Sequence, residues 1–387
     1  MKVRGLAIGF LLSATVVTST EAINVFQIGN SLTWDSQPTG IQAMAESAGL
    51  IWTGGHHIRG ASSIKQIYDD PTQSNDRLSL PGPTWVEGLP ENDWDVLTIQ
   101  PHNSSGNTMG HDIDYALLFR EAAKSQGRNL DIQMYVYSSW PTLSTNWADW
   151  LTSVPNELTQ LTVHRRQFYE HVAARLSDTL SEPVHVIPAG DVLYRLKQEI
   201  EAGTIPNITS MSALYRDNIH MSSYGQFAAG STVLATLAGI NPTGIVPADE
   251  YGSMNPETVL RIQEIVWDVV ANHPWSGVTP ISGDYNGDES VDLADYQWWR
   301  RSFGKSMSHA ADGNRNGEVD IADYTVWRDH YQTGLNAEAA VAVPEPTGLS
   351  LLAIVAVAGL SIPRCRRHLR REIIVSQTLP AELWTGV

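Results

Sequence analysis

The fold of this chain is decided by a stretch near its start, NVFQIGNSLT at residues 24–33. The apolar residues Val25–Ile28 predict a short strand, Gly29 ends it, and Ser31 follows in the turn. A strand that runs into a Gly-x-Ser turn holds a hydroxyl at the carboxyl edge of a sheet, where open α/β folds place their active sites. Such turns are common, so this stretch alone also fits an ordinary turn in which Ser31 caps a helix.

A second motif, DNIH at residues 217–220, lies far downstream in the same domain. It supplies a carboxylate, Asp217, and a base, His220, three residues apart. A serine hydroxyl is a weak nucleophile at neutral pH and needs a base held by a third group. Imidazole titrates near working pH, so His220 can take the proton of Ser31 while Asp217 orients the ring. A lone Asp-x-x-His is usually a surface loop, but the joint pattern favours a catalytic triad.

The sequence between these motifs alternates short β-rich runs with amphipathic helical runs. Alternation of this kind predicts an α/β fold with a parallel sheet and helices on both faces. The predicted strands are Val25–Ile28, Leu50–Thr53, Val96–Ile99, Ile132–Tyr137 and Val184–Ile187. The predicted helices are Ile41–Ala48, Ser62–Tyr68, Ile113–Lys124, Leu158–Leu176, Val192–Glu201, Ser223–Ala238 and Val259–Val270.

Serine early and Asp-x-x-His late is the layout of the SGNH (GDSL-like) hydrolases, and residues 23 to about 240 resemble this family. The first family block is Gly-Asp-Ser-Leu, and the chain reads Gly29-Asn30-Ser31-Leu32, with asparagine in place of aspartate. The last block matches at Asp217 and His220. The resemblance implies a three-layer α/β/α, flavodoxin-like parallel sheet. It also implies a serine esterase that needs no metal for catalysis.

The resemblance also implies an oxyanion hole. The Ser31 amide is expected to contribute one N–H. The second family block supplies a glycine N–H, and Gly60, in a loop after the second strand, is the expected match. The third block is degraded to Gln100-Pro101-His102-Asn103, so either Asn103 or Gln100 is the third donor. A loop amide without a catalytic role is the alternative for both.

Composition limits the classes of function. The 387 residues allow one large catalytic unit and smaller modules, and 42% apolar content suits a globular core. A formal net charge of −17 argues against nucleic-acid binding, which requires a basic face. The single cysteine, Cys365, excludes a disulfide within the monomer and a cysteine nucleophile in the main domain.

A repeat of acidic loops follows a linker at residues 276–283. Calcium takes six to eight oxygen ligands, and a 12-residue loop supplies them from positions 1, 3, 5, 7, 9 and 12. Two in-phase copies of this pattern predict two calcium sites. The expected ligands of the first loop are Asp284, Asn286, Asp288, Ser290 (carbonyl), Asp292 and Asp295. Those of the second loop are Asp312, Asn314, Asn316, Glu318 (carbonyl), Asp320 and Asp323.

Each acidic loop runs into an aromatic-rich helix, predicted at Tyr296–Phe303 and Tyr324–Tyr331. This arrangement resembles a dockerin type I module, a small all-α second domain whose loop–helix units bind calcium. The resemblance implies structural calcium and a cohesin-like protein partner.

The two ends of the chain carry export signals. Residues 1–22 have a positive start, an apolar run and a small-residue cleavage site, which predicts a secretory signal peptide. Near the other end, Pro344-Glu345-Pro346, the apolar run Leu349–Ile362 and an arginine cluster resemble the PEP-CTERM sorting signal. That resemblance implies sorting machinery at the membrane and a cell-surface or secreted location. The alternative is a plain single-span anchor.

The expected domains are a signal peptide at 1–22, the hydrolase at 23–275, the linker at 276–283, the dockerin-like module at 284–335, a spacer at 336–343, the sorting segment at 344–371 and a tail at 372–387. The expected activity is hydrolysis of acyl esters, above all acetyl esters on a carbohydrate. The alternatives are a lipase or thioesterase on the same fold and a non-catalytic glycan-binding surface protein.

Overall fold

The structure is a computed structural model. It describes residues 22–72, 84–279, 281–287, 290–305, 310–314 and 318–331. Contacts divide the chain into two units, residues 1–335 and 336–387, and the second unit lies outside the described residues. The predicted signal peptide up to residue 21, the spacer, the sorting segment and the tail therefore lie outside them as well. Ala22, the last residue of the predicted signal peptide, begins the first strand.

The first unit is built on a five-stranded parallel sheet, which confirms the predicted α/β class. The strand order is β2-β1-β3-β4-β5, the order of flavodoxin-like folds. The strands are β1 (Ala22–Gly29), β2 (Ile51–Ile58), β3 (Val96–Ile99), β4 (Gln133–Tyr137) and β5 (His185–Ile187). From β1 the chain adds β2 on one side of the sheet, and the later strands are added on the other side, beginning with β3. The loops that follow β1 and β3 therefore run in opposite directions and leave a crevice between them.

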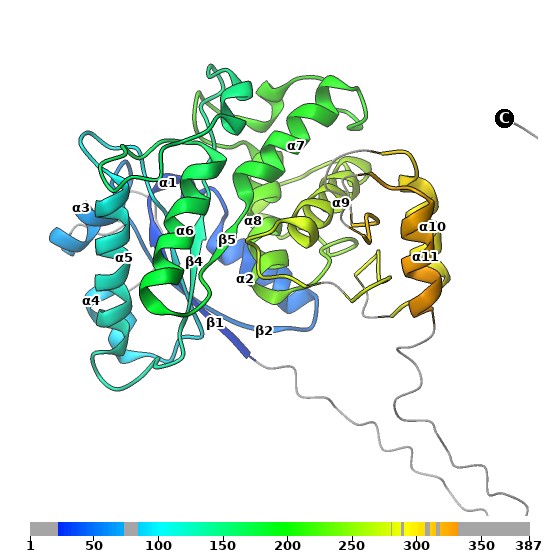
Figure 1. Cartoon of the computed structure of the whole chain (residues 1–387). Helices are drawn as coiled ribbons and strands as arrows, with labels where there is room; N and C mark the ends of the chain where they lie inside the picture. Colours follow the sequence, from blue (N-terminus) through cyan, green and yellow to red (C-terminus); the bar gives the residue numbers. More distant parts are fainter. Residues whose placement is uncertain are drawn as a thin grey trace, which may run out of the picture. The chain divides into compact units, whose positions relative to one another are not determined.

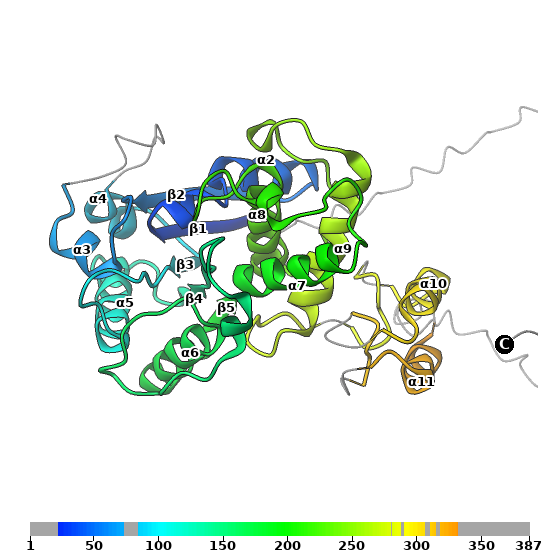
Figure 2. The same ribbon diagram turned by 90° about the horizontal axis from the view of Figure 1, so that it is seen from above.

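Helices cover both faces of the sheet (Figure 1). One layer contains α3 (Ile64–Asp69), α4 (Trp85–Glu91), α5 (Met109–Lys124) and α6 (Arg166–Leu180). The other contains α2 (Pro38–Ser47), α7 (Ala189–Glu201), α8 (Ser223–Ala238) and α9 (Pro256–Asn272). Figure 2 shows the two layers on opposite sides of the strands.

The core lies between these layers and fixes the strands rigidly. All four residues of β3 are buried, and Phe26 and Ile28 of β1 are fully buried. Near-continuous apolar strands are expected when a parallel sheet is covered on both faces. The carboxyl ends of β1 and β3, where the candidate site residues begin, are thus anchored in the most buried part of the unit.

The predicted boundaries differ most from the observed ones at one helix and one strand. The helix predicted to begin at Leu158 begins at Arg166, because residues 158–162 instead bond across to the start of α5: Met109 N–H donates to Gln160 O (2.8 Å) and Gly110 N–H to Leu158 O (2.8 Å). The second strand extends to Ile58 rather than Thr53. Its glycines, Gly54 and Gly55, pair with β1 like any strand residue. A short helix, α1 (Ser31–Trp34), was not predicted.

Helices α10 (Leu293–Ser302) and α11 (Ile321–His330) begin three residues earlier than predicted, because Asp292 and Asp320 cap their N-termini. The two repeats are joined reciprocally. Trp299 Nε1 donates to Asp320 O (2.9 Å), and Trp327 Nε1, its counterpart in the second repeat, donates to Asp292 O (2.7 Å). Their aromatic cluster also includes Trp267 and Ala271 of α9.

The start of the predicted linker packs against the sheet unit. Val186 N–H of β5 donates to Trp275 O (2.7 Å), and Ser276 Oγ donates to Val270 O (2.8 Å). A Cβ on Gly277, which has φ +79°, would lie 2.8 Å from ring atoms of His185. Residues 275–277 therefore pack as part of the sheet unit rather than as a free linker.

Candidate active site

Ser31 is the first residue of α1 and follows directly on β1. Asn30, fully buried, caps this helix: its Oδ1 accepts from Leu32 N–H (3.0 Å) and its Nδ2 donates to Ser62 O (3.1 Å). A carboxylate could accept the first bond but could not donate the second. Asn30 therefore ties the turn that carries Ser31 to the loop after β2.

Gln100, at the end of β3, supports the turn from beneath. Its Oε1 accepts from Asn30 N–H (3.1 Å), Thr33 N–H (3.0 Å) and Thr33 Oγ1 (2.6 Å). Because two of these donors are backbone amides, the atom facing them must be the oxygen, which leaves the Nε2 group on the other side. That Nε2 is buried and has no hydrogen-bond partner among the described residues. Gln100 thus fixes where Ser31 sits.

His220 lies opposite Ser31 on a loop between η2 (Met211–Leu214) and α8. Its Nε2 is 3.0 Å from Ser31 Oγ, and its Nδ1 is 2.8 Å from Asp217 Oδ2. A proton on Nδ1, facing the carboxylate, leaves Nε2 free to accept from the serine hydroxyl. The structure brings together the three residues predicted to form the triad.

Asp217 is stabilised as an anion by its own loop. Its Oδ1 accepts from Ile219 N–H (2.8 Å) and His220 N–H (2.8 Å). Desolvation alone would raise the pKa of this carboxyl. The two amide donors and the imidazole outweigh it and lower the pKa to about 2. Asp217 therefore stays charged at neutral and mildly acidic pH.

The expected oxyanion donors differ in how they are held and in how exposed they are. Among the described residues, the Ser31 N–H makes no hydrogen bond, whereas the next two amides of α1 are hydrogen-bonded. Gly60 lies in an exposed turn that is pinned beside β1, because Arg59 N–H donates to Gly29 O (2.9 Å). Asn103 is exposed, three residues beyond the buried Gln100.

Two charged residues of the site were not predicted. Asp35 closes α1 and is fully buried, and it pairs with Arg216 (2.7 Å), the residue before Asp217. The signal available in the sequence was their spacing: Asp35 is one helical turn after Ser31, and Arg216 adjoins the Asp-x-x-His motif.

Two aromatics and two histidines near the carboxyl ends of the strands complete the surroundings. Trp140 is fully buried and donates from Nε1 to Ile219 O (2.8 Å), so it supports the His220 loop and offers no face to a sugar; Trp34 is half-buried. Burial lowers the pKa of His102 to about 4 and that of His164 to about 3. Both rings are neutral at physiological pH.

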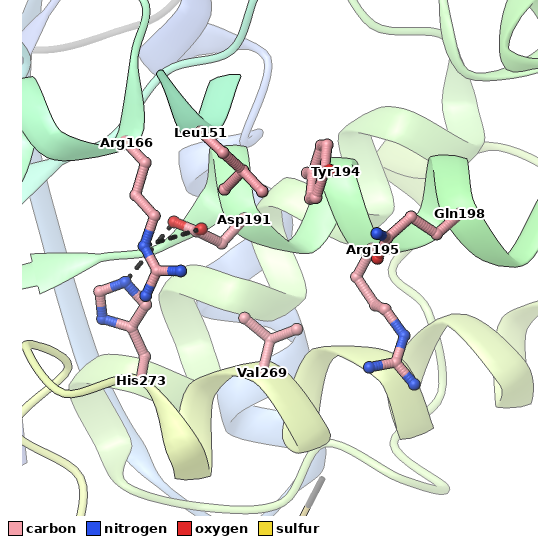
Figure 3. A pocket seen from close by; sticks show the side chains of 8 residues that line it. All are labelled: Leu151, Arg166, Asp191, Tyr194, Arg195, Gln198, Val269 and His273. Atoms are coloured by element: carbon pink, nitrogen blue, oxygen red, sulfur yellow. Dashed lines mark ion pairs between the residues drawn. The ribbon is translucent and has the colours of Figure 1, made fainter. Parts of the chain in front are cut away.

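A cavity of about 320 Å³ lies elsewhere, between α6, α7 and α9 (Figure 3). Three of its polar groups lie together: Asp191 lies 3.4 Å from Arg166 Nε and 3.5 Å from His273 Nε2. Desolvation would raise the pKa of Asp191, but these partners and Trp150 lower it. None of the three triad residues lines this cavity.

The predicted calcium loops are described in part, and Asp288 and Asn316, at position 5 of each, lie outside the described residues. The carboxylates at position 12 face their own loop backbones. Asp295 Oδ1 accepts from Tyr285 N–H (2.7 Å), and Asp323 Oδ1 accepts from Asn314 N–H (3.1 Å). Over the described ranges, no group of three or more His, Cys, Asp or Glu side chains is placed to hold a metal ion.

No helix within the described ranges is both long and apolar enough to cross a membrane. The predicted sorting segment at 344–371 is outside those ranges.

No family model and no curated protein matches the chain. Solved structures that resemble it include a DUF4886 family protein from Bacteroides uniformis ATCC 8492, at 15% identity over 67% of this chain and 98% of that one, with a TM-score of 0.46. A carbohydrate esterase family 3 structure from Talaromyces cellulolyticus has 13% identity over 56% and 96%, with a TM-score of 0.35. TesA has 10% identity over 55% and 97%, with a TM-score of 0.33.

Proposed function

We propose that this protein is a serine hydrolase of the SGNH type that cleaves acyl esters, acetyl esters of carbohydrates foremost. The observation that carries the proposal is the continuous line of contacts from Ser31 Oγ through His220 to Asp217, at 3.0 Å and 2.8 Å. Both separations are within the range in which a base can take a proton. The line stands at the β1–β3 crevice of a flavodoxin-like strand order, where open α/β sheets bind ligands.

In the proposed reaction, Ser31 Oγ attacks the ester carbonyl while His220 Nε2 accepts the serine proton. Asp217 stabilises the imidazolium and holds its tautomer. The carbonyl oxygen gains negative charge and binds the Ser31 and Gly60 amides, with Asn103 or Gln100 as the third donor. His220 then protonates the departing alkoxide, and water releases the acyl group from Ser31 by the same steps in reverse order. Each proton taken by the imidazole is returned, so the enzyme is regenerated.

The buried position of Gln100 Nε2 bears on the third donor. Gln100 Oε1 is committed to the nucleophile turn, and Nε2 is shielded from solvent. Asn103 is exposed and can turn toward a bound ester. We therefore favour Asn103 as the donor and Gln100 as the support of the turn.

The decisive experiment is fluorophosphonate labelling of the full chain with mapping of the modified residue, beside turnover of aryl acetates. Wild type should be labelled at Ser31, and Ser31→Ala should lose both labelling and turnover. Ser105→Ala, an exposed serine in the loop after β3, is the matched control and should keep both. A wild-type protein that is folded, unlabelled and inactive would rule out the hydrolase.

The acyl group is tested separately. A series of esters from acetate to long chains, together with acyl thioesters, distinguishes a carbohydrate deacetylase from a lipase or thioesterase. A fall in kcat/KM with chain length supports the deacetylase, and a rise supports the lipase. Glycan binding that persists in Ser31→Ala without any turnover in wild type would instead support a non-catalytic glycan-binding protein.

We also propose that the two acidic repeats bind calcium structurally and present the dockerin-like surface to a cohesin-like partner on an exported protein. Support comes from the in-phase loops and from the repeated caps, since Asp292 and Asp320 each accept from the amide two residues on (2.7 Å in both). Binding requires the position 12 carboxylates to exchange their backbone donors for the ion. Calorimetric titration of chelator-treated full chain with calcium should show two sites, both weakened by Asp284→Ala with Asp312→Ala. Magnesium serves as the control ion, and no heat with calcium would reject the proposal.

A further inference from the structure

A buried carboxylate connects the two loops that carry the triad. Asp35 is the last residue of the α1 turn, and its N–H donates to Ser31 O (3.0 Å), so it moves with the nucleophile. Its side chain is fully buried. Removing a carboxylate from water is costly unless it is paired and hydrogen-bonded. The positions of the groups that pair with Asp35 therefore indicate the structural role of its charge.

Among the described residues, the donors to the Asp35 side chain are of two kinds. They come from the neck of the His220 loop, which is residues 216 and 221 on either side of the Asp217–His220 motif, or from α8, the helix that follows the loop. Arg216 Nη1 donates to Oδ1 (2.7 Å), Met221 N–H donates to Oδ2 (2.8 Å), and Gln226 Nε2 lies 3.4 Å from Oδ1. Arg216 and Met221 are the residues immediately outside the Asp217–His220 motif. Asp35 is thus hydrogen-bonded to the residues at both ends of the segment that contains His220.

The neck is closed independently of Asp35. Arg216 N–H donates to His220 O (2.9 Å), and Arg216 Nη1 also donates to Met221 O (2.7 Å). Ser222 N–H donates to Leu214 O (2.9 Å) one step further out. Residues 217–220 are therefore a short closed loop, and Asp35 sets where that closed loop stands relative to Ser31.

We propose that Asp35 and Arg216 are positioning residues that hold His220 Nε2 at its distance from Ser31 Oγ through the catalytic cycle. The inference rests on the proposed hydrolase function. It adds a second carboxylate to the site, one that touches neither the substrate nor the imidazole and acts through the backbone of Met221 and the guanidinium of Arg216.

A negative charge suits this role better than a neutral group, because the charges around Asp35 change during turnover. The groups that face it are Arg216 and His220 on the loop and Tyr137 at the end of β4. Burial raises the pKa of Asp35 above its ordinary value, and the Met221 amide, Arg216 and His220 offset only part of that rise. When His220 takes the serine proton, the attraction between Asp35 and the imidazolium strengthens and holds the loop in place.

The test compares Asp35→Asn with a matched change elsewhere. The asparagine keeps the volume and can still accept from Met221 N–H, but it loses the charge. Glu199→Gln is the control: it neutralises another carboxylate that pairs with an arginine, Arg261 (3.0 Å), on α7 and α9, away from the triad. Both variants should lower the melting temperature.

Only Asp35→Asn should lower kcat, by about 100-fold at unchanged KM, as expected for a base displaced by about 1 Å. Its kcat/KM profile should also shift its acidic limb toward lower pH, because a negative charge near His220 has been removed. Arg216→Lys, which keeps a cation but loses the second donor geometry, should fall between wild type and Asp35→Asn. Equal kcat losses in Asp35→Asn and Glu199→Gln, or an unchanged pH profile in Asp35→Asn, would overturn the proposal.

Hydrogen exchange separates this proposal from the hydrolase itself. Loss of the Asp35 charge should speed exchange at the Met221 and His220 amides and leave β1 and β3 unchanged, whether or not any ester is cleaved. An inactive wild type with this exchange pattern would reject the hydrolase, and the positioning role in catalysis with it, and would leave only a structural hold of Asp35 on the loop. Active protein without it would reject the positioning role alone.

Discussion

The nucleophile turn, residues 29–33, and the His220 loop, residues 216–221, face each other across the site but are held in different ways. The turn rests on the neutral, fully buried amide of Gln100, which accepts three hydrogen bonds from it. The loop is gripped at its neck by the buried charge of Asp35, while its tip is open: the Asp217 side chain is 50% exposed and that of His220 is 27% exposed. The turn is part of the core, and the loop is an attachment to it.

This difference predicts how the two regions respond to change. An alteration at the loop tip should cost catalysis with little loss of stability. An alteration beneath the turn should cost both, because the same atoms serve the core and the nucleophile. The four predictions below run from the largest expected effect to the smallest.

Removing the reacting atoms gives the largest effect. Ser31→Ala and His220→Ala should each lower kcat by about 10⁴-fold or more, since either change removes the whole nucleophilic route. Both should unfold within a degree or two of wild type in thermal scans. The double variant should be no worse than either single variant, and additive losses would contradict a triad that works as a unit.

Changing the acid at the loop tip comes next. Asp217→Asn should lower kcat by about 10³-fold, because an amide can hold the wrong imidazole tautomer and cannot stabilise the cation. The free energy of unfolding at neutral pH should change little, because the side chain is half in water. Steady-state kinetics and urea unfolding of the same preparation check both points, and a large loss of stability would show that the tip is not a separable attachment.

A change beneath the turn tests the other half of the comparison. Gln100→Leu should lower kcat by about 100-fold and also cost about 3 kcal/mol of unfolding free energy, because it leaves buried donors on Asn30 and Thr33 without an acceptor. Gln27→Leu is the matched control, since Gln27 is a buried glutamine of β1 whose Nε2 has no partner within the described residues. That control should be neutral or stabilising. Chemical denaturation with kinetics at saturating substrate would show whether stability and rate fall together.

As the pH falls, the sheet should lose stability through His56 before the loop loses stability through Asp217. Burial lowers the pKa of His56, in β2, to about 4, below its ordinary 6.5, so the unfolded chain binds a proton that the folded chain refuses. Its contribution to stability is complete above pH 6.5 and is lost as pH falls toward 4, about 2 kcal/mol by pH 5. Asp217, whose pKa is lowered to about 2, becomes protonated only between about pH 4 and 2, and the accompanying loss of stability is small because its side chain is half exposed. Urea unfolding at pH 7.5 and 5.0 should show a smaller difference for His56→Gln than for wild type, and equal differences would disprove this assignment.

How far the sequence could foresee this arrangement depends on the range of the interaction. The parallel sheet follows from periodic apolar runs, and the meeting of Ser31 with the Asp-x-x-His loop follows from two spaced motifs. The residues that support these two motifs could not be predicted from the sequence in the same way. The sequence leaves Asn103 and Gln100 as alternative oxyanion donors, and only the folded register shows the Gln100 oxygen turned beneath Asn30. Asp35 was overlooked because a charge next to a helical turn usually faces water, and its burial is created by Arg216, 181 residues away.

The short helix α1 was missed for a local reason. Four residues are too few to show helical periodicity, and its stability comes from the Asn30 cap and from Gln100 rather than from its own sequence. The late start of α6 has a tertiary cause as well, since residues 158–162 bond to the start of α5. In both places long-range hydrogen bonds override local preference.

The paired tryptophan bonds between the two acidic repeats have a consequence for assembly of the module. Since Trp299 needs the backbone of the second repeat and Trp327 needs that of the first, neither repeat can satisfy its indole alone. Either repeat alone would therefore leave its indole N–H without this acceptor. The same exchange couples the two loops. If a ligand orders one loop, the indole hydrogen bonds carry that ordering to the other, so the binding curve of the ligand should be steeper than for two independent sites.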